Sequence, residues 1–310
     1  CASGMAAITA VMELFKPGDH IVVSDDLYGG TYRSFHRINE KNGIQFTAVN
    51  TSHLEEIKAA VTTATKAIYI ETPSNPMMQV TDIEAVAKLA KEHHALLIVD
   101  NTFLTPYLQR PIELGANIVV HSGTKYLCGH NDVICGFLII KQGLDVEKAR
   151  IDLIYKSEGA NLSAFDSWLM IRSIKTLGIR MEKQSKNALK IATWLQTVPT
   201  VSQVYYIGLP EHPGYEVHKK QASGFGGMIS FRTINKEIAM KSLSKVELVY
   251  YAESLGGVET LITYPVTQTH KESPVELLNK LGIDDCLLRL SVGIEDAEDI
   301  IADLEQALRP

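Results

Sequence analysis

Two apolar segments of the sequence are each followed by side chains that can do chemistry. Residues Leu96–Val99 lead into Asp100, and residues Asn117–His121 lead into Ser122–Lys125, which contains two hydroxyl groups and an amine. A lysine amine can condense with an aldehyde, neighbouring hydroxyls can bind phosphate, and an aspartate can keep a pyridine nitrogen protonated, so that the ring accepts electrons. Taken singly, Asp100 and Lys125 are explained more simply by a salt bridge or a solvated turn. Taken together, these residues are the parts that a pyridoxal-phosphate site requires.

A second element that can bind phosphate stands at the start of the sequence, where Ser3-Gly4-Met5 precedes an apolar run with helical spacing, Ala6–Phe15. Ser3 can cap the helix, and Gly4 allows backbone N–H groups to approach an anion. Many helices begin in this way, so a plain N-cap is the better explanation unless other residues point to phosphate. The glycine patterns of dinucleotide-binding folds and of P-loops are absent from the sequence.

Three further residues can contact a flat cofactor or an anionic substrate. Tyr28 follows the apolar segment His20–Ser24, where its ring can stack on a cofactor, although a partly exposed loop tyrosine is equally consistent. Asn75 stands in a loop with two prolines and can donate a hydrogen bond to a ring oxygen or serve in a turn. Arg289 lies within the apolar segment Leu287–Val292. Because an unpaired buried arginine is costly, we expect it to pair with a structural or a substrate carboxylate.

These residues need a framework that brings the ends of several segments together. The first half alternates short apolar runs with amphipathic stretches, which predicts a mostly parallel, doubly wound α/β sheet whose ligands bind beyond the carboxyl ends of the strands. The helices are expected at Tyr32–Lys41, Leu54–Thr62 and Ile83–His93. The strands are expected at His20–Ser24, Ile44–Val49, Ala67–Glu71, Leu96–Asp100, Asn117–His121 and Gly136–Lys141.

The second half has a different pattern. A long helix is expected over Ala164–Leu195 with a break or bend at Gly178, and a final helix over Ala297–Leu308. Strands at Ser202–Ile207, Met228–Arg232 and Leu287–Val292, and an apolar strand ending at Glu253-Ser254, predict a smaller α+β domain. We place a large domain at residues 1–175 and a small domain at residues 176–310.

Composition excludes several classes of protein. The formal net charge of −6 gives no electrostatic support to a general nucleic-acid-binding role. The longest apolar runs are too short to span a bilayer, and no basic-then-apolar signal segment opens the sequence. The four cysteines match no zinc pattern and no disulfide framework, and the ten histidines form no metal-ligand pattern. We therefore expect no metal and a reducing, cytoplasmic compartment. Because the sequence opens at Cys1 on an expected helix start, we also expect that an upstream segment is missing from it.

Several strings together resemble the Cys/Met-metabolism pyridoxal-phosphate enzymes, a family that includes cystathionine gamma-lyase, cystathionine beta-lyase, cystathionine gamma-synthase and methionine gamma-lyase. The resemblance covers essentially the whole sequence in the correct order, and the combination is highly specific. The strings are Ser3–Ala7, Tyr28–Thr31, Glu71–Pro76, Val99–Phe103, His121–Tyr126 and Glu253–Gly257.

The resemblance implies a fold-type I large domain, pyridoxal 5'-phosphate as cofactor, and a role for each matching residue. Lys125 is similar to the lysine that forms the Schiff base and carries protons, Asp100 to the partner of the pyridine nitrogen, and Tyr28 to the stacked ring. The resemblance implies that these three residues are catalytic. The further cofactor contacts implied are Gly4, Met5, Asn75, Thr102, Ser122 and Thr124. The substrate contacts implied are Arg289 for the α-carboxylate, with Ser254 and Asn75, and Arg33 and Glu253 for the far end of the substrate.

The resemblance also bears on which reaction is catalysed. Methionine gamma-lyases have a cysteine where this sequence has Gly30, and enteric-type beta-lyases have an aromatic residue where it has Glu253. The segment Ile262–His270 is similar to that of bacterial gamma-lyases of the reverse transsulfuration route. These features favour cleavage of L-cystathionine to cysteine, 2-oxobutanoate and ammonia, with hydrogen sulfide release from cysteine or homocysteine as a side reaction. Beta-lyase and gamma-synthase activities remain alternatives.

Other classes of function and the assembly state are also open. A nicotinamide-dependent oxidoreductase requires a glycine-rich turn after its first strand, which the sequence lacks. An inactive scaffold of the same fold is expected to have lost Lys125 or Asp100, and both are present. Family members carry an N-terminal arm that binds phosphate in a neighbouring subunit, and no such segment precedes Cys1. The resemblance therefore implies a homotetramer with shared active sites, an amino-acid substrate, and neither nucleic acid nor membrane as partner.

Overall fold

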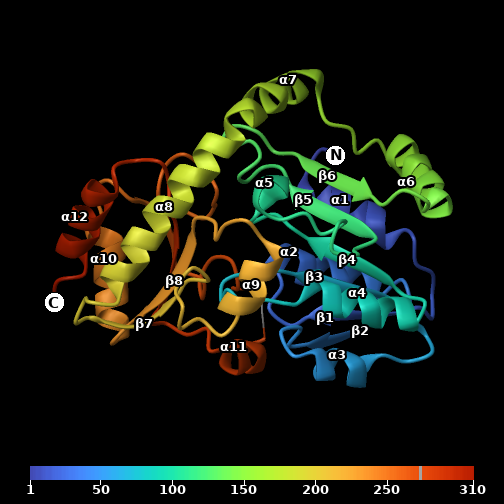
Figure 1. Cartoon of the computed structure of the whole chain (residues 1–310), viewed down its shortest axis with the longest axis horizontal. Coiled ribbons are helices and arrows are strands. Elements are labelled where there is room, and N and C mark those ends of the chain that lie inside the picture. Colours follow the sequence, from blue (N-terminus) through green and yellow to red (C-terminus); the bar gives the residue numbers. More distant parts are fainter. Residues whose placement is uncertain (272–273) are drawn as a thin grey trace.

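The structure is a computed structural model that describes residues 1–271 and 274–310. Six strands of the first half form one sheet in the order β2-β1-β3-β4-β5-β6, on the right in Figure 1. Neighbouring strands are parallel except β5 and β6, which are antiparallel. The predicted mostly parallel sheet is confirmed. The strands are β1 (His20–Ser24), β2 (Gln45–Val49), β3 (Thr65–Glu71), β4 (Leu96–Asp100), β5 (Ile118–Ser122) and β6 (Gly136–Ile140).

Helices cover both faces of this sheet because its strands are apolar on both sides. In β1, Ile21 and Val23 pack in one core with α1 and α6, whereas Val22 packs in a second core with α3 and α4. The alternation is that of a pleated strand, whose successive side chains point to opposite faces. The helical segments are α1 (Gly4–Met12), α2 (Gly29–Arg33), the π-helix η1 (Ser34–Asn39), α3 (Leu54–Ala60), α4 (Ile83–Glu92), α5 (Thr105–Leu108) and α6 (Asp145–Glu158).

The predicted long helix consists of three segments: α7 (Ala164–Ser173), a 3-10 turn η2 (Ile174–Thr176) and α8 (Leu177–Leu195). The break therefore lies before Gly178, and the prediction of a break at Gly178 itself was wrong. A Cβ at residue 178 would lie 2.9 Å from Cε2 of Tyr107, so the glycine allows α8 to pack against α5 rather than ending a helix. The predicted domain division at residue 175 falls in η2 and stays a prediction.

The second half forms a five-stranded sheet in the order β7-β8-β11-β10-β9, on the left in Figure 1. Helices α8, α10 and α12 pack against it around a core that includes Ile191, Phe231 and Ile300. The remaining elements are β7 (Val201–Tyr205), α9 (Tyr215–Gln221), β8 (Met228–Thr233), α10 (Lys236–Lys245), β9 (Tyr250–Tyr251), β10 (Leu261–Thr263), α11 (Val275–Leu281), β11 (Leu287–Ser291) and α12 (Ala297–Ala307).

One strand of the smaller sheet differs from prediction. The apolar strand expected to end at Glu253-Ser254 is only two residues long, Tyr250–Tyr251, and both side chains are exposed. Strand β9 lies at the edge of the sheet and pairs only with β10 in the described part of the chain. Glu253 and Ser254 therefore lie in the loop that follows it. Among the described residues, no helix is long and apolar enough to cross a membrane.

Candidate active site

A cavity of about 230 Å³ opens beyond the carboxyl ends of β3, β4 and β5. This is the edge at which an open parallel sheet binds its ligands. All nine residues that the sequence assigns to a cofactor line this one cavity, although they come from five separate segments. They are Gly4, Met5, Tyr28, Asn75, Asp100, Thr102, Ser122, Thr124 and Lys125.

Lys125 lies in the turn that follows β5, and its amine is held inside the cavity. Nζ donates a hydrogen bond to Oγ of Ser254 at 3.3 Å. Burial, and then the nearby charge of Arg289, lower the pKa of Lys125 to about 8. The amine is therefore neutral far more often near neutral pH than an ordinary lysine, and a neutral amine can attack a carbonyl group or accept a proton.

Asp100 is the last residue of β4, and Thr102 binds one of its two carboxylate oxygens. Its Oδ1 accepts hydrogen bonds from the Thr102 hydroxyl at 2.6 Å and the Thr102 N–H at 3.1 Å. The Tyr69 hydroxyl lies 3.5 Å from Oδ2. Burial raises the pKa of Asp100 in spite of these donors. A buried carboxylate of this kind requires a cation beside it to stay ionised, and a protonated pyridine nitrogen is such a cation.

Glu71 also lines the cavity, and the sequence assigned no role to it. It ends β3, where it is the register partner of Asp100 in β4. Its Oε2 accepts a hydrogen bond from the Tyr28 N–H at 3.0 Å. Burial, and then the charge of Asp100, raise the pKa of Glu71 well above its usual value, so Glu71 is the neutral member of the pair. Its place at a strand end next to Asp100 was the signal that could have found it.

The start of α1 supplies a place for a phosphate group. Ser3 caps the helix by accepting a hydrogen bond from the Ala6 N–H at 2.9 Å, as predicted. A Cβ at Gly4 would lie 2.8 Å from Cβ of Ser122, so only a glycine lets the first turn approach the end of β5 this closely. The first-turn N–H groups have no acceptor within the helix, and they adjoin the Ser122 hydroxyl. The Thr124 hydroxyl, in contrast, donates to the Cys135 carbonyl at 3.2 Å.

Tyr28 lines the cavity at the entrance to α2, with 39% of its surface exposed. Burial is the largest cause of its raised pKa, followed by the charge of Glu253, whereas Arg33 lowers it. These two residues, which the sequence assigns to the far end of a substrate, are exposed, and their charges reach the outer side of the cavity. The structure therefore brings opposite charges to the side where Tyr28 meets solvent.

Arg289 lies in β11 with only 1% of its surface exposed. Nη1 donates to Oδ1 of Asn75 at 2.9 Å, and Nη2 donates to the Ser254 carbonyl at 2.9 Å and to Oγ1 of Thr263 at 3.1 Å. Nε finds no partner within residues 1–271 and 274–310. None of these three acceptors is a carboxylate, which favours the substrate carboxylate over a structural one. An anion that bound Nε would satisfy the one buried donor left unpaired.

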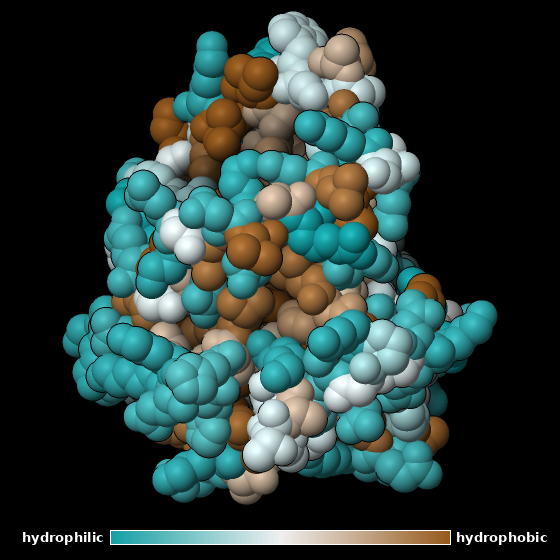
Figure 2. All heavy atoms as spheres, turned by 90° about the vertical axis from the view of Figure 1, so that its right-hand side faces the viewer, coloured by the Kyte–Doolittle hydropathy of each residue, from teal (hydrophilic) through white to brown (hydrophobic). Residues whose placement is uncertain are grey.

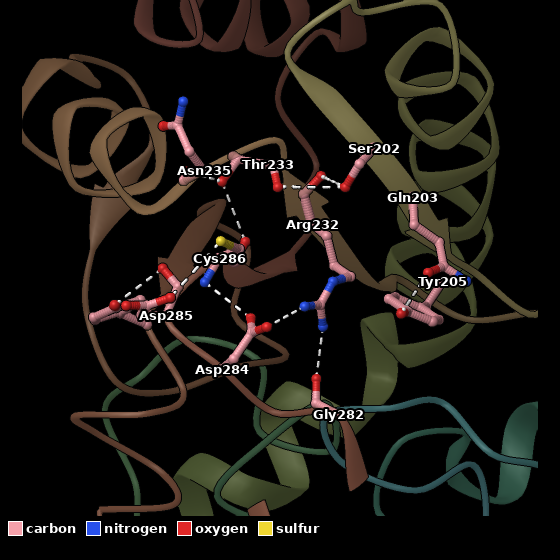
Figure 3. A network of polar contacts seen from close by, with 11 residues as sticks. Ser202, Gln203, Tyr205, Arg232, Thr233, Asn235, Gly282, Asp284, Asp285 and Cys286 are labelled. Carbon is pink, nitrogen blue, oxygen red and sulfur yellow. Dashed lines mark hydrogen bonds and ion pairs between the residues drawn. The ribbon is translucent and has the colours of Figure 1, made fainter. Parts of the chain in front are cut away.

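A cluster of candidate metal ligands lies outside this cavity. Asp284, Asp285 and Cys286 bring three ligand atoms within 4.8 Å of one another. However, Asp284 forms an ion pair with Arg232, and Asp285 forms one with Lys236 at 3.3 Å. Figure 3 shows that the Arg232 guanidinium also reaches the Gly282 carbonyl, so the network fastens β8 to the turn before β11. The cluster is explained as a structural network.

Comparison with known proteins agrees with the arrangement of the cavity. Residues 1–309 match the family of Cys/Met metabolism PLP-dependent enzymes. The chain is 51% identical to cystathionine gamma-lyase of Bacillus subtilis and 50% identical to cystathionine beta-lyase of Lactococcus lactis subsp. cremoris, in both cases over 99% of this chain and 80% of the relative.

A solved structure also resembles this chain. The crystal structure of cystathionine gamma-lyase from Lactobacillus plantarum complexed with L-serine has a TM-score of 0.96 and 44% identity, over 99% of this chain and 80% of that one. The cavity fits the cofactor of this family, since it combines a lysine amine, a buried carboxylate that needs a cation and a glycine-lined helix start beside a hydroxyl. The chain belongs to the family of Cys/Met metabolism PLP-dependent enzymes, and its cofactor is pyridoxal phosphate.

Proposed function

We propose that the protein is a carbon–sulfur lyase that cleaves L-cystathionine at the γ-carbon, giving cysteine, 2-oxobutanoate and ammonia. The observation that carries the proposal is the buried guanidinium of Arg289, whose Nε has no partner among the described residues. The charges of Arg289 and Glu253 both act on the Lys125 amine. A substrate with an amino-acid group at both ends matches this distribution of charge.

Bound pyridoxal phosphate supplies an electron sink for the electrons released at the substrate's α-carbon. We assign the proton transfers to Lys125. Its amine lies close to Ser254 and has a lowered pKa. The neutral amine can take the α-proton and, once it has released that proton, can take a second proton from the β-carbon. Loss of these protons permits the bond between the γ-carbon and sulfur to break, and the sulfur leaves as the thiol of cysteine. Water then releases the nitrogen as ammonia, which leaves 2-oxobutanoate.

Asp100 and Arg289 complete the assignment. Asp100, held by Thr102, supplies the negative charge opposite the ring nitrogen. Arg289 binds the α-carboxylate through its fork, and Asn75 and Ser254 hold that fork in place. Glu253 and Arg33 carry charges opposite to those of the ammonium and carboxylate at the far end of cystathionine. Cysteine and homocysteine lack that far end, so we expect them to react more slowly and to release hydrogen sulfide.

Cleavage at the β-carbon is the second candidate, because a relative 50% identical to this chain is named cystathionine beta-lyase. That reaction yields homocysteine, pyruvate and ammonia from the same substrate. A relative named cystathionine gamma-synthase/O-acetylhomoserine (thiol)-lyase, from Bacillus subtilis, is 46% identical. A synthase would instead join cysteine to an activated homoserine ester.

Analysis of the keto acids formed from L-cystathionine distinguishes the two lyase reactions. We expect 2-oxobutanoate and cysteine in equal amounts, with pyruvate below about a tenth of the total, a preference of about 1.4 kcal/mol. Liquid chromatography of derivatised keto acids measures both products, and the Lys125→Ala protein serves as the blank. A product pool dominated by pyruvate would overturn the γ-cleavage proposal while leaving the lyase assignment in place.

We also propose that the protein assembles as a homotetramer with shared active sites. Large apolar side chains are exposed along α7 and the start of α8: Phe165 at 67%, Trp168 at 57%, Ile171 at 63% and Ile179 at 73%. In Figure 2, apolar surface gathers in the upper part of the face, at the height at which Figure 1 places α6 and α7. Ile134, which lines the cavity, is 65% exposed. Exposed apolar surface of this extent is typical of an interface.

Light scattering coupled to size-exclusion chromatography tests this assembly. We expect a mass of four 34.2 kDa chains, and we expect Ile171→Asp to lower it, because a charge would be buried in the interface. Leu189→Asp, on the exposed side of α8 at 44% exposure, is the matched control and should leave the mass unchanged. A parent protein that elutes as a monomer at micromolar concentration would contradict the proposal.

A further inference from the structure

A buried carboxylate outside the cavity holds one side of the loop that carries Asn75. Asp26 follows β1 and has 1% of its surface exposed. Its Oδ2 accepts a hydrogen bond from the Ser74 hydroxyl at 2.5 Å and another from the Met77 N–H at 3.1 Å. These donors lie on either side of Asn75 in the sequence. Burial raises the pKa of Asp26 to about 7, so the two hydrogen bonds do not depend on a full negative charge. Two buried hydrogen bonds to one oxygen fix the backbone segment between their donors.

The other side of the same loop is bound to the smaller sheet. The Pro76 carbonyl accepts a hydrogen bond from the Ser230 hydroxyl in β8 at 2.7 Å, and Asn75 Oδ1 accepts one from Arg289 in β11 at 2.9 Å. Ser230 and Arg289 are register partners in that sheet. The loop is thus clamped between Asp26 on the large sheet and two neighbouring residues on the small sheet.

We infer that Asp26 is a positioning residue for substrate binding: it holds the loop at Ser74 and Met77 so that Asn75 orients the Arg289 guanidinium toward the substrate carboxylate. The inference rests on the proposed binding of that carboxylate by Arg289. The cofactor contacts Lys125 and Asp100 lie on other strand ends. Asn75 also lines the cofactor cavity, but eight of the nine residues assigned to the cofactor lie outside the clamped loop. Loss of the clamp should therefore weaken substrate binding much more than cofactor binding.

The clamp has a specific chemical requirement. Both hydrogen bonds go to Oδ2, whereas Oδ1 finds no hydrogen-bond partner among the described residues. His270 Nε2 lies 3.9 Å from Oδ1. Burial lowers the pKa of His270 to about 4, so this histidine is neutral. One neutral oxygen acceptor at the position of Oδ2 is thus sufficient. Asparagine can supply that oxygen, and alanine cannot.

The test uses the holoenzyme with Asp26→Ala, Asp26→Asn and Ser74→Ala, and Asp25→Ala as the matched control. Asp25 is the adjacent buried aspartate, but it pairs with Lys280 at 2.8 Å instead of with the loop. Two readouts are measured: the KM and kcat for cystathionine, and the dissociation constant of glycine from the change it causes in cofactor absorbance. Glycine has the α-carboxylate but no leaving group.

For Asp26→Ala and Ser74→Ala we expect KM and the glycine dissociation constant to rise about tenfold, the scale of one buried hydrogen bond. We expect kcat to change less than about threefold and the cofactor absorbance to stay normal. Asp26→Asn should restore both constants, and Asp25→Ala should leave them unchanged. If Asp26→Ala does not fold, Ser74→Ala decides the matter alone, because Ser74 is the donor to the same oxygen.

A parallel variant, Arg289→Lys, keeps the two hypotheses apart. It retains the charge and loses the fork, so we expect a KM at least about tenfold higher. If Arg289→Lys raises KM while Asp26→Ala and Ser74→Ala do not, the positioning role is overturned and the proposed function stands. If Arg289→Lys also leaves KM unchanged, the proposed carboxylate site itself fails. A kcat loss without a KM change in Asp26→Ala would likewise overturn the positioning role.

Discussion

Replacement of Lys125 by alanine is expected to abolish covalent attachment of the cofactor and to reduce turnover by on the order of 10⁴-fold, the upper range for loss of a general base. The reason is that the described part of the cavity contains no second amine: its other lining residues are hydroxyl, carboxyl, amide, aromatic and apolar. Lys125 also has the lowered pKa that both roles require. When the Lys125→Ala protein is reconstituted with pyridoxal phosphate, the cofactor should bind only reversibly and without a covalent bond.

Borohydride reduction followed by peptide mass mapping measures this directly. In the parent protein the reduced cofactor should be found on the peptide that contains Lys125. Lys175→Ala, an exposed lysine in η2, is the matched control and should retain full labelling and activity. A reduced cofactor fixed on any other lysine of the Lys125→Ala protein, together with residual turnover well above the expected level, would show that the assignment of Lys125 is wrong.

Asp100→Asn is expected to have the second largest effect. Removing one member of a buried ion pair typically costs about 3–5 kcal/mol, so we expect at least a hundredfold loss of cofactor affinity. The rate of elimination should fall by a similar factor, because a cofactor ring whose nitrogen has no charged partner is a poorer electron sink. The cofactor dissociation constant from absorbance titration and the kcat for cystathionine measure the two losses separately.

Thr102→Val provides the graded control for this prediction. It removes the 2.6 Å hydrogen bond to Oδ1 but keeps the carboxylate, so we expect a loss of about tenfold, the scale of one charged hydrogen bond. An Asp100→Asn protein with near-parental affinity and rate would mean that another group balances the ring nitrogen. Glu71, the register partner of Asp100, would then be the residue to replace next.

The sequence predicted the cavity well because its residues follow strands. In a parallel sheet the carboxyl ends of neighbouring strands meet at one edge, so Asp100 and Lys125 had to lie close together once their strands were recognised. The predicted strands have ends within two residues of those observed. The cap at Ser3 was also predictable, because it depends on local chemistry alone.

The contacts that depend on side chains distant in sequence could not be predicted. Asp26 and Ser74 are 48 residues apart, and Arg289 and Asn75 are 214 apart. Apolar patterns indicate which elements form, but not which polar groups meet across them. For the same reason the sequence left two partners open for Arg289, and it gave no role to Glu71. The extent of β9 was overestimated because an edge strand with exposed side chains has no buried face to mark its end. Strand β10 was missed because only three residues form it.

The residues proposed to bind the cofactor and most of those proposed to bind the substrate come from different halves of the sequence. The nine residues predicted for the cofactor all come from the first 125 positions, whereas three of the five residues proposed for the substrate, Arg289, Ser254 and Glu253, come from the last 60 or so. Ser254 accepts a hydrogen bond from Lys125, so mutations at Arg289 and Glu253 are the ones expected to alter substrate choice without disturbing the cofactor. With this separation, a change of substrate specificity requires few substitutions and no rebuilding of the cofactor site. We expect the same separation in relatives that are about half identical to this chain and bear the names of a beta-lyase and a gamma-lyase.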